Sequence, residues 1–257
     1  MKYQLFDAHC HLDSSRFDKD REELLILAQR VGVKGIVLAG TTKDSWRKIR
    51  QLTALHPSMY TALGLHPYFI DQHTAADIRS LELAVETPPI VAVGEIGLDF
   101  YNPALDKNKQ VVLFHAQIHI ANMAKLPVVL HVRKAHDEVL KHLRISNFQQ
   151  GGVVHAFNGS MDQAKRYIDM GFVLGFGGAM TYQRATKLRA LASTLPLSSI
   201  VLETDAPDMK PVTCQLDRNT PIHLLDNFRV LCELRSENHS QVALQTTLNA
   251  MRVYRIE

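Results

Sequence analysis

Eight short apolar runs recur along the chain at intervals typical of βα units. They occupy residues 3–9, 35–40, 60–66, 90–97, 127–132, 152–157, 172–176 and 199–205. Segments with helical spacing lie between them, for example at 21–33, 109–126, 162–171 and 185–195. Strands that are apolar almost throughout need cover on both faces, which is typical of a parallel sheet surrounded by helices. We therefore expect an α/β fold of the (β/α)8 TIM barrel type.

An open, doubly wound sheet is the alternative arrangement of the same elements. Its first strand usually leads into a glycine-rich turn, and the corresponding residues 7–13, DAHCHLD, contain no glycine. The length of 257 residues is also close to that of one α/β barrel. Because no linker, low-complexity stretch or block of like charge divides the chain, we expect a single domain over residues 1–257.

Composition excludes several classes of function. The formal net charge of +3 is too small for a protein that coats nucleic acid regardless of sequence. The cysteines Cys10, Cys214 and Cys232 form no CxxC pair, so neither a disulfide framework nor a zinc knuckle is indicated. No apolar run reaches the roughly 18 residues that a membrane span needs, and the start does not resemble a signal peptide. We predict a cytoplasmic protein without membrane contact, and no obligate protein partner is indicated.

Residues that can bind a metal stand at or near the ends of five of the eight apolar runs. These residues are His9, His11, Glu95, His131, His155 and Asp205. The carboxyl ends of barrel strands meet at one face, so we expect these six side chains to form one cluster. Four imidazoles and two carboxylates are enough for two divalent ions. Along an extended strand His9 and His11 point the same way, whereas Cys10 should face the helices.

The remaining histidines are expected to have other roles. His115 and His119 have the spacing of two zinc ligands on a helix, but Ala116 replaces the glutamate of HExxH, which leaves a helix-face role. For the others we expect solvent-exposed positions; these are His56, His73, His136, His142, His223 and His239.

Seven ordered motifs resemble those of TatD deoxyribonucleases and related metal-dependent hydrolases, most closely the YjjV-like branch. They are DAHCHLD (7–13), GLHP (64–67), GEIGLDF (94–100), HVRKA (131–135), HAFNGS (155–160), LETDAP (202–207) and RNTP (218–221). The resemblance covers essentially the whole chain. It implies that one metal is held by His9, His11 and Asp205, that a second is held by His131 and His155, and that Glu95 bridges them.

Two departures from the family pattern lie beside this expected site. Family members often have cysteine at the position of Ala156 and an aromatic residue at the position of Asp208. Both departures concern substrate preference rather than metal binding.

The expected chemistry is hydrolysis by two divalent ions. Ions about 3.5–4 Å apart can activate a bridging water and stabilise both the attacking and the leaving oxygen of a phosphoryl transfer. We expect the catalytic residues to be Asp205, as general base, and the bridging Glu95. No GxSxG motif is present, so no covalent intermediate is expected. Four imidazoles favour Zn²⁺ or Mn²⁺, whereas the resemblance implies Mg²⁺, so the metal stays open among these.

Further polar residues are expected around the ions. Glu203 shares a strand face with Asp205, and it is expected either to accept an imidazole N–H or to form an ion pair inside the barrel. His66 and Arg133 are expected to contact a substrate phosphate. Lys134 and Lys210 would add phosphate contacts nearby.

These features predict a phosphodiesterase or deoxyribonuclease, similar to a 3′–5′ exonuclease. The expected substrate is single-stranded DNA or a 3′ end, because a concave pocket admits a frayed end and excludes a duplex. A small phosphoester is the alternative substrate. One alternative is an amidohydrolase-type enzyme for C–N or ester bonds, but many of these bridge their metals with a modified lysine, and residues 90–100 contain Glu95 and no lysine. The other is a non-catalytic metal-binding protein, although all six ligand positions are filled.

Overall fold

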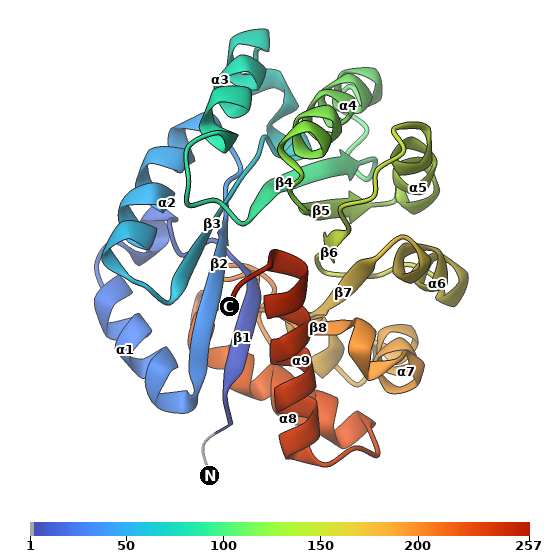
Figure 1. The fold of residues 1–257 in the computed structure, drawn as a ribbon. Helices are drawn as coiled ribbons and strands as arrows, with labels where there is room; N and C mark the ends of the chain where they lie inside the picture. Colours follow the sequence, from blue (N-terminus) through green and yellow to red (C-terminus); the bar gives the residue numbers. More distant parts are fainter. Residues whose placement is uncertain (1–2) are drawn as a thin grey trace.

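The computed structural model describes residues 3–257, and eight parallel strands form a barrel in sequence order (Figure 1). Strands β1 to β8 span Leu5–Cys10, Val33–Ala39, Met59–Leu63, Ala92–Asp99, Val128–Arg133, Gly152–Val154, Phe172–Phe176 and Ile200–Leu202. The barrel closes through hydrogen bonds beyond β8: Asp205 N–H donates to the His9 carbonyl at 2.9 Å, and His11 N–H donates to the Ala206 carbonyl at 2.8 Å. The predicted (β/α)8 fold is confirmed.

Helices follow the strands and surround the barrel (Figure 1). Within residues 3–257, helices α1 to α9 span Arg21–Val31, Lys43–Leu55, Ala75–Val85, Lys107–Ala124, His136–Ile145, Met161–Asp169, Thr186–Thr194, Leu224–Leu234 and His239–Tyr254. The short 3-10 helices η1 to η5 span Ser15–Phe17, Pro67–Gln72, Gly178–Thr181, Leu197–Ser199 and Pro221–His223. The four helical segments expected from spacing correspond to α1, α4, α6 and α7.

Helix α6 illustrates how local sequence defines these elements. The Ser160 hydroxyl accepts the Gln163 N–H at 3.1 Å, and the Gln163 side chain accepts the Ser160 N–H at 2.9 Å, which satisfies two backbone donors at the start of the helix. Ala164 and Tyr167 are buried against the barrel. The polar residues between them face outward, so the helix has one apolar face.

Two apolar clusters hold the fold together. The larger one lies between strands and helices and includes Leu38, Phe114 and Leu130. The smaller one fills the barrel interior and includes both Val129 of β5 and Tyr254 of α9. Helix α9 therefore covers one end of the barrel (Figure 1). Functional residues of such barrels lie at the other end, where the strands have their carboxyl ends.

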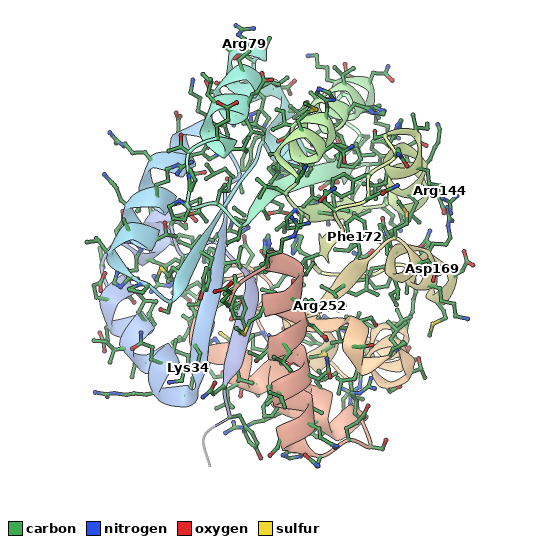
Figure 2. All side chains as sticks on the ribbon, viewed as in Figure 1. Lys34, Arg79, Arg144, Asp169, Phe172 and Arg252 are labelled. Atoms are coloured by element: carbon green, nitrogen blue, oxygen red, sulfur yellow. The ribbon has the colours of Figure 1, made fainter. Side chains whose placement is uncertain are left out.

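Charged side chains project from the outer surface, among exposed apolar ones such as Leu55 and Met123. Figure 2 shows Lys34, Arg79 and Arg144 extending outward from the ribbon, whereas Phe172 of β7 is buried. Among residues 3–257, no helix has both the length and the apolar character that crossing a bilayer requires. The cytoplasmic location stays a prediction.

Candidate metal centre

An irregularity in strand β1 orients its two histidines. Between Asp7 and Cys10, β1 contains one more residue than the paired stretch of β2. Ala8 belongs to the interior cluster and Cys10 to the outer one, so the bulge lets both Ala8 and His9 face the interior. His11 then follows on the same side as His9. The expected outward orientation of Cys10 is what the structure has.

Strand β4 has a similar irregularity at Glu95. Val93 and Ile96 both belong to the outer cluster although they are three residues apart, because β4 contains an extra residue between them. The bulge directs the Glu95 side chain toward the top of the barrel, where it is 1% exposed. Both bulges therefore place potential metal ligands.

The first group of donor atoms comes from His9, His11, Asp205 and Glu95. The two Nε2 atoms lie 3.1 Å apart. Asp205 Oδ1 lies 3.3 Å and 3.4 Å from them, and Glu95 Oε2 lies 3.3 Å from each. Four ligands arranged tetrahedrally about 2.0–2.1 Å from an ion would be about 3.3 Å from one another. The donor atoms of His9, His11 and Asp205, and equally those of His9, His11 and Glu95, have this spacing, so each set of three fits one divalent ion of zinc size.

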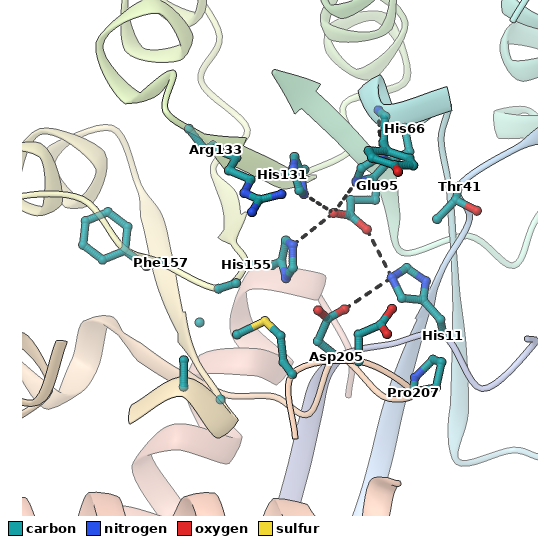
Figure 3. Close-up of a pocket in the computed structure, with 18 of the residues that line it drawn as sticks. His11, Thr41, His66, Glu95, His131, Arg133, His155, Phe157, Asp205 and Pro207 are labelled. Carbon is teal, nitrogen blue, oxygen red and sulfur yellow. Dashed lines mark hydrogen bonds and ion pairs between the residues drawn. The ribbon is translucent and has the colours of Figure 1, made fainter. Parts of the chain in front are cut away.

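The second group surrounds the other oxygen of Glu95. Its Oε1 lies 3.0 Å from His131 Nδ1, from His155 Nε2 and from His66 Nε2. Figure 3 shows the Glu95 carboxylate between these rings and His11. One carboxylate thus places one oxygen in each group, an arrangement that would let it ligate two ions.

His66 differs in its protonation from His131 and His155, whose pKa values are raised. Its Nδ1 accepts the backbone N–H of Tyr68 at 3.0 Å, and burial lowers the pKa of the ring to about 4. In this neutral ring the proton is on Nε2, which donates to Glu95. His66 is therefore a hydrogen-bond donor, and a metal held by the second group would be ligated by His131 and His155.

The charges and unpaired atoms of the cluster also fit a cation. Glu95 Oε2 is buried and makes no hydrogen bond, which is costly unless a cation is bound there. Burial would raise the pKa of Glu95, but its interactions with the surrounding imidazoles, His66, His155 and His9, outweigh burial and hold the pKa well below its usual value. Burial likewise opposes ionisation of Asp205, and its hydrogen bonds to His11 and His9 lower its pKa. Both carboxylates are ionised at neutral pH, as metal ligands require.

Surrounding groups fix the ligand rings. His11 Nδ1–H donates to the Ala39 carbonyl at 2.9 Å, which leaves Nε2 available. His131 Nε2 lies 3.1 Å from Asp99 Oδ2, which leaves Nδ1 available. Sequence reasoning did not identify Asp99, although it stands at the carboxyl end of β4 on the same motif as Glu95.

Glu203 is fully buried beside His155. Its Oε1 accepts the Ala156 N–H at 2.6 Å and lies 3.6 Å from His155 Nδ1, which is beyond a direct hydrogen bond. A Cβ atom at Gly175 would lie 2.1 Å from Glu203 Oε2, so glycine at that position makes room for the carboxylate. A role for Glu203 in orienting His155 stays a prediction.

A cavity of about 820 Å³ lies over the donor atoms, and both His66 and Arg133 line it (Figure 3). The Arg133 guanidinium lies 3.7 Å from the centre of the Tyr101 ring, which holds it at the cavity wall. Lys134 and Lys210 do not line this cavity, and both are exposed. Their expected phosphate contacts stay a prediction.

Two histidines that we expected at the surface are buried. His136 and His142 are each 7% exposed, because they lie on the face of α5 that packs against neighbouring helices. His136 Nε2 lies 3.1 Å from Asn158 Oδ1. His142 lies between His115, at 2.6 Å, and Glu138, at 2.8 Å. His115 thus has the helix-face role that was expected.

Comparison with known proteins identifies the family. The family described as TatD related DNase matches residues 6–255. The chain is 39% identical over 248 residues to the metal-dependent hydrolase YjjV of Escherichia coli K12, covering 96% of this chain and 95% of that protein. It is 31% identical over 261 residues to the 3′-5′ ssDNA/RNA exonuclease TatD of Erwinia tasmaniensis, covering 98% and 100%.

The crystal structure of YjjV from Escherichia coli K12 has the same fold, with a TM-score of 0.96, 37% identity and 100% coverage of both chains. The family match extends over nearly the whole barrel and includes all of the clustered histidines and carboxylates that could hold a metal ion. The chain therefore belongs to the TatD family of metal-dependent hydrolases.

Proposed function

We propose that this chain is a binuclear phosphodiesterase that removes nucleotides from the 3′ end of single-stranded DNA. The observation that carries the proposal is the position of Glu95, whose two oxygens each belong to a separate group of donor atoms at the floor of an 820 Å³ cavity. The name of the Erwinia relative, a 3′-5′ ssDNA/RNA exonuclease, supports the choice of substrate.

Under this proposal, one ion would be held by His9, His11 and Asp205 and the other by His131 and His155, and Glu95 would ligate both. When bound, two divalent ions would lower the pKa of a water molecule and stabilise negative charge on the phosphoryl oxygens. Imidazole-rich groups favour Zn²⁺ or Mn²⁺ over Mg²⁺. The spacing of 3.1–3.4 Å among the donor atoms of His9, His11 and Asp205 supports the same preference.

The chain's own residues would bind the phosphate and move the proton. Asp205 is ionised, and its side chain is 12% exposed at the cavity floor, so it can accept a proton from a water there. His66 Nε2–H donates to Glu95 in the structure, and it would turn to a phosphate oxygen in the cavity once Glu95 ligates an ion. Arg133 offers a planar guanidinium that matches two phosphate oxygens.

The test uses single-stranded and duplex oligonucleotides labelled at either the 3′ or the 5′ end, incubated with Mg²⁺, Mn²⁺ or Zn²⁺. We expect stepwise shortening of single strands from the 3′ end and little cutting of closed circular duplex. Internal cuts in closed duplex would refute the proposal. So would brisk hydrolysis of bis-p-nitrophenyl phosphate without cleavage of any nucleic acid, which would make a small phosphoester the substrate.

A further inference from the structure

A second cavity, of about 620 Å³, adjoins the one over the metal centre. The two cavities share a rim, which consists of Arg16, Ala179, Pro207, Asp208 and Met209. These residues come from the loops that follow β1, β7 and β8. The second cavity therefore opens from the active-site face of the barrel, and a ligand can extend from one cavity into the other.

An ion pair spans the shared rim. Arg16 Nη1 lies 3.4 Å from Asp208 Oδ1, and the two side chains are 44% and 72% exposed. A pair this exposed stabilises a protein by only about 0–1 kcal/mol, so Arg16 can readily exchange Asp208 for another anion. Asp208 itself places negative charge where a polyanion would pass.

Two further cations line the second cavity away from the rim. Lys210 Nζ donates to the Leu216 carbonyl at 3.0 Å, and the Arg184 guanidinium lies 5.3 Å from the centre of the Tyr182 ring. In these contacts the Lys210 ammonium group meets a carbonyl and the Arg184 guanidinium meets an aromatic ring, and both side chains are exposed. The exposed Asp217 is the other carboxylate of the cavity, which leaves cations in excess.

We propose that this second cavity binds the backbone phosphates of the nucleotides on the 5′ side of the cleaved bond, an inference that rests on the proposed exonuclease function. With the 3′-terminal nucleotide over the metal centre, the rest of the strand has to leave the first cavity. The apolar rim residues Ala179, Pro207 and Met209 offer a surface for sugars and bases. Cations combined with an aromatic ring are the usual means of holding a single strand without reading its sequence.

The test compares the KM for a decanucleotide, a dinucleotide and bis-p-nitrophenyl phosphate, because only the decanucleotide can reach the second cavity. In the metal-loaded enzyme, Arg184→Gln and Lys210→Gln should each raise the decanucleotide KM by up to about five-fold, the size expected for one exposed ion pair. Each should also reduce the slope of log KM against log salt by about 0.7, the value for one phosphate contact on a single strand. The KM values of the two small substrates should not change.

Asp208→Asn should have the opposite effect and lower the decanucleotide KM, because it removes a repulsive charge from the rim. Misfolding cannot make the enzyme bind the decanucleotide more tightly, so a lower KM in Asp208→Asn also excludes structural damage as the cause. Lys34→Gln is the matched control, since Lys34 is an exposed cation on the outside of the barrel (Figure 2).

The outcomes separate the two proposals. One result is that the wild type cleaves the decanucleotide while Arg184→Gln and Lys210→Gln both leave its KM unchanged. That result would overturn the second cavity as a binding site and leave the exonuclease function intact. Equal changes for all three substrates would also overturn it, because they would indicate damage to the metal centre. If the wild type cleaves neither oligonucleotide, the proposed function is wrong and the inference is wrong with it.

Discussion

The carboxylate of Asp99 lies 3.1 Å from Nε2 of His131, the ring nitrogen that does not face Glu95. Burial opposes ionisation of Asp99, but its hydrogen bond to His131 outweighs burial and lowers the pKa of the carboxyl. A carboxylate in this position fixes the proton on Nε2 and makes Nδ1 a better metal ligand. Asp99 is thus not a metal ligand itself, but it orients His131, which belongs to the second donor group.

Replacing Asp99 with alanine should weaken one metal site and spare the other. We expect the affinity of the second ion to fall about 10–100-fold, the usual cost of losing such a carboxylate. Metal titration monitored by calorimetry measures both sites, and Asp169→Ala on the exposed surface of α6 is the control. Two ions bound with unchanged affinity would show that Asp99 does not support His131.

His66→Ala should impair catalysis without removing metal. Losing a hydrogen bond to a charged phosphate costs about 1.5–3 kcal/mol, so kcat/KM should fall about 10–100-fold, and His66→Gln, which retains an N–H donor, should recover part of it. Metal content should equal that of the wild type, because His66 is a donor in the structure. Loss of one ion from His66→Ala would instead make this residue a ligand.

Asp205→Asn should abolish hydrolysis while the protein folds and retains at least one ion. The amide can ligate weakly through its oxygen but cannot accept a proton. Turnover of bis-p-nitrophenyl phosphate and metal content, measured on the same preparation, separate the two effects. Activity within a few-fold of the wild type would exclude Asp205 as the base. His9→Ala and His131→Ala should lose metal together with activity.

The metal-free protein should be most stable in mildly acidic solution. Burial opposes protonation of His11 and His155, but their carboxylate neighbours outweigh it and raise both pKa values well above 6.5. This stabilisation is fully present below pH 6.5 and is lost as the pH rises through the raised values. The lowered pKa of Asp205 acts in the opposite sense, since its stabilisation is present above pH 3.8 and is lost as the pH falls.

Zinc should therefore raise the Tm more at about pH 8 than at about pH 6, since the ion has fewer protons to displace at the higher pH. The measurement compares the Tm of thermal unfolding in EDTA with that in zinc, at several pH values between about 6 and 8. A zinc-dependent shift in Tm that is the same at every pH would contradict the assignment of imidazoles as ligands.

Barrel geometry explains why much of the site was predictable from sequence. Parallel strands bring their carboxyl ends together, so His131 and His155 could be placed in one cluster from their positions after apolar runs. The bulges at His9 and Glu95 could not be predicted, because they depend on the register between neighbouring strands. Strict alternation from the interior residue Ala8 would have turned His9 outward.

The residues that sequence reasoning missed or misplaced depend on contacts between elements. Asp99 reaches His131 because β4 and β5 are neighbours, with Asp99 paired to Arg133. His136 and His142 are buried because of how α5 packs, and their residue type gives no sign of it. Local patterns specify strands and helices, whereas these contacts arise only when the barrel closes.

The central claim is that Glu95 joins two ions in one centre, and metal stoichiometry tests it most directly. Protein stripped with a chelator, refilled with Zn²⁺ or Mn²⁺ and freed of excess metal should contain about two ions per chain by elemental analysis. Glu95→Ala should reduce this content, because both donor groups lose an oxygen. A wild-type content that never exceeds one ion per chain, and that Glu95→Ala leaves unchanged, would contradict the binuclear centre.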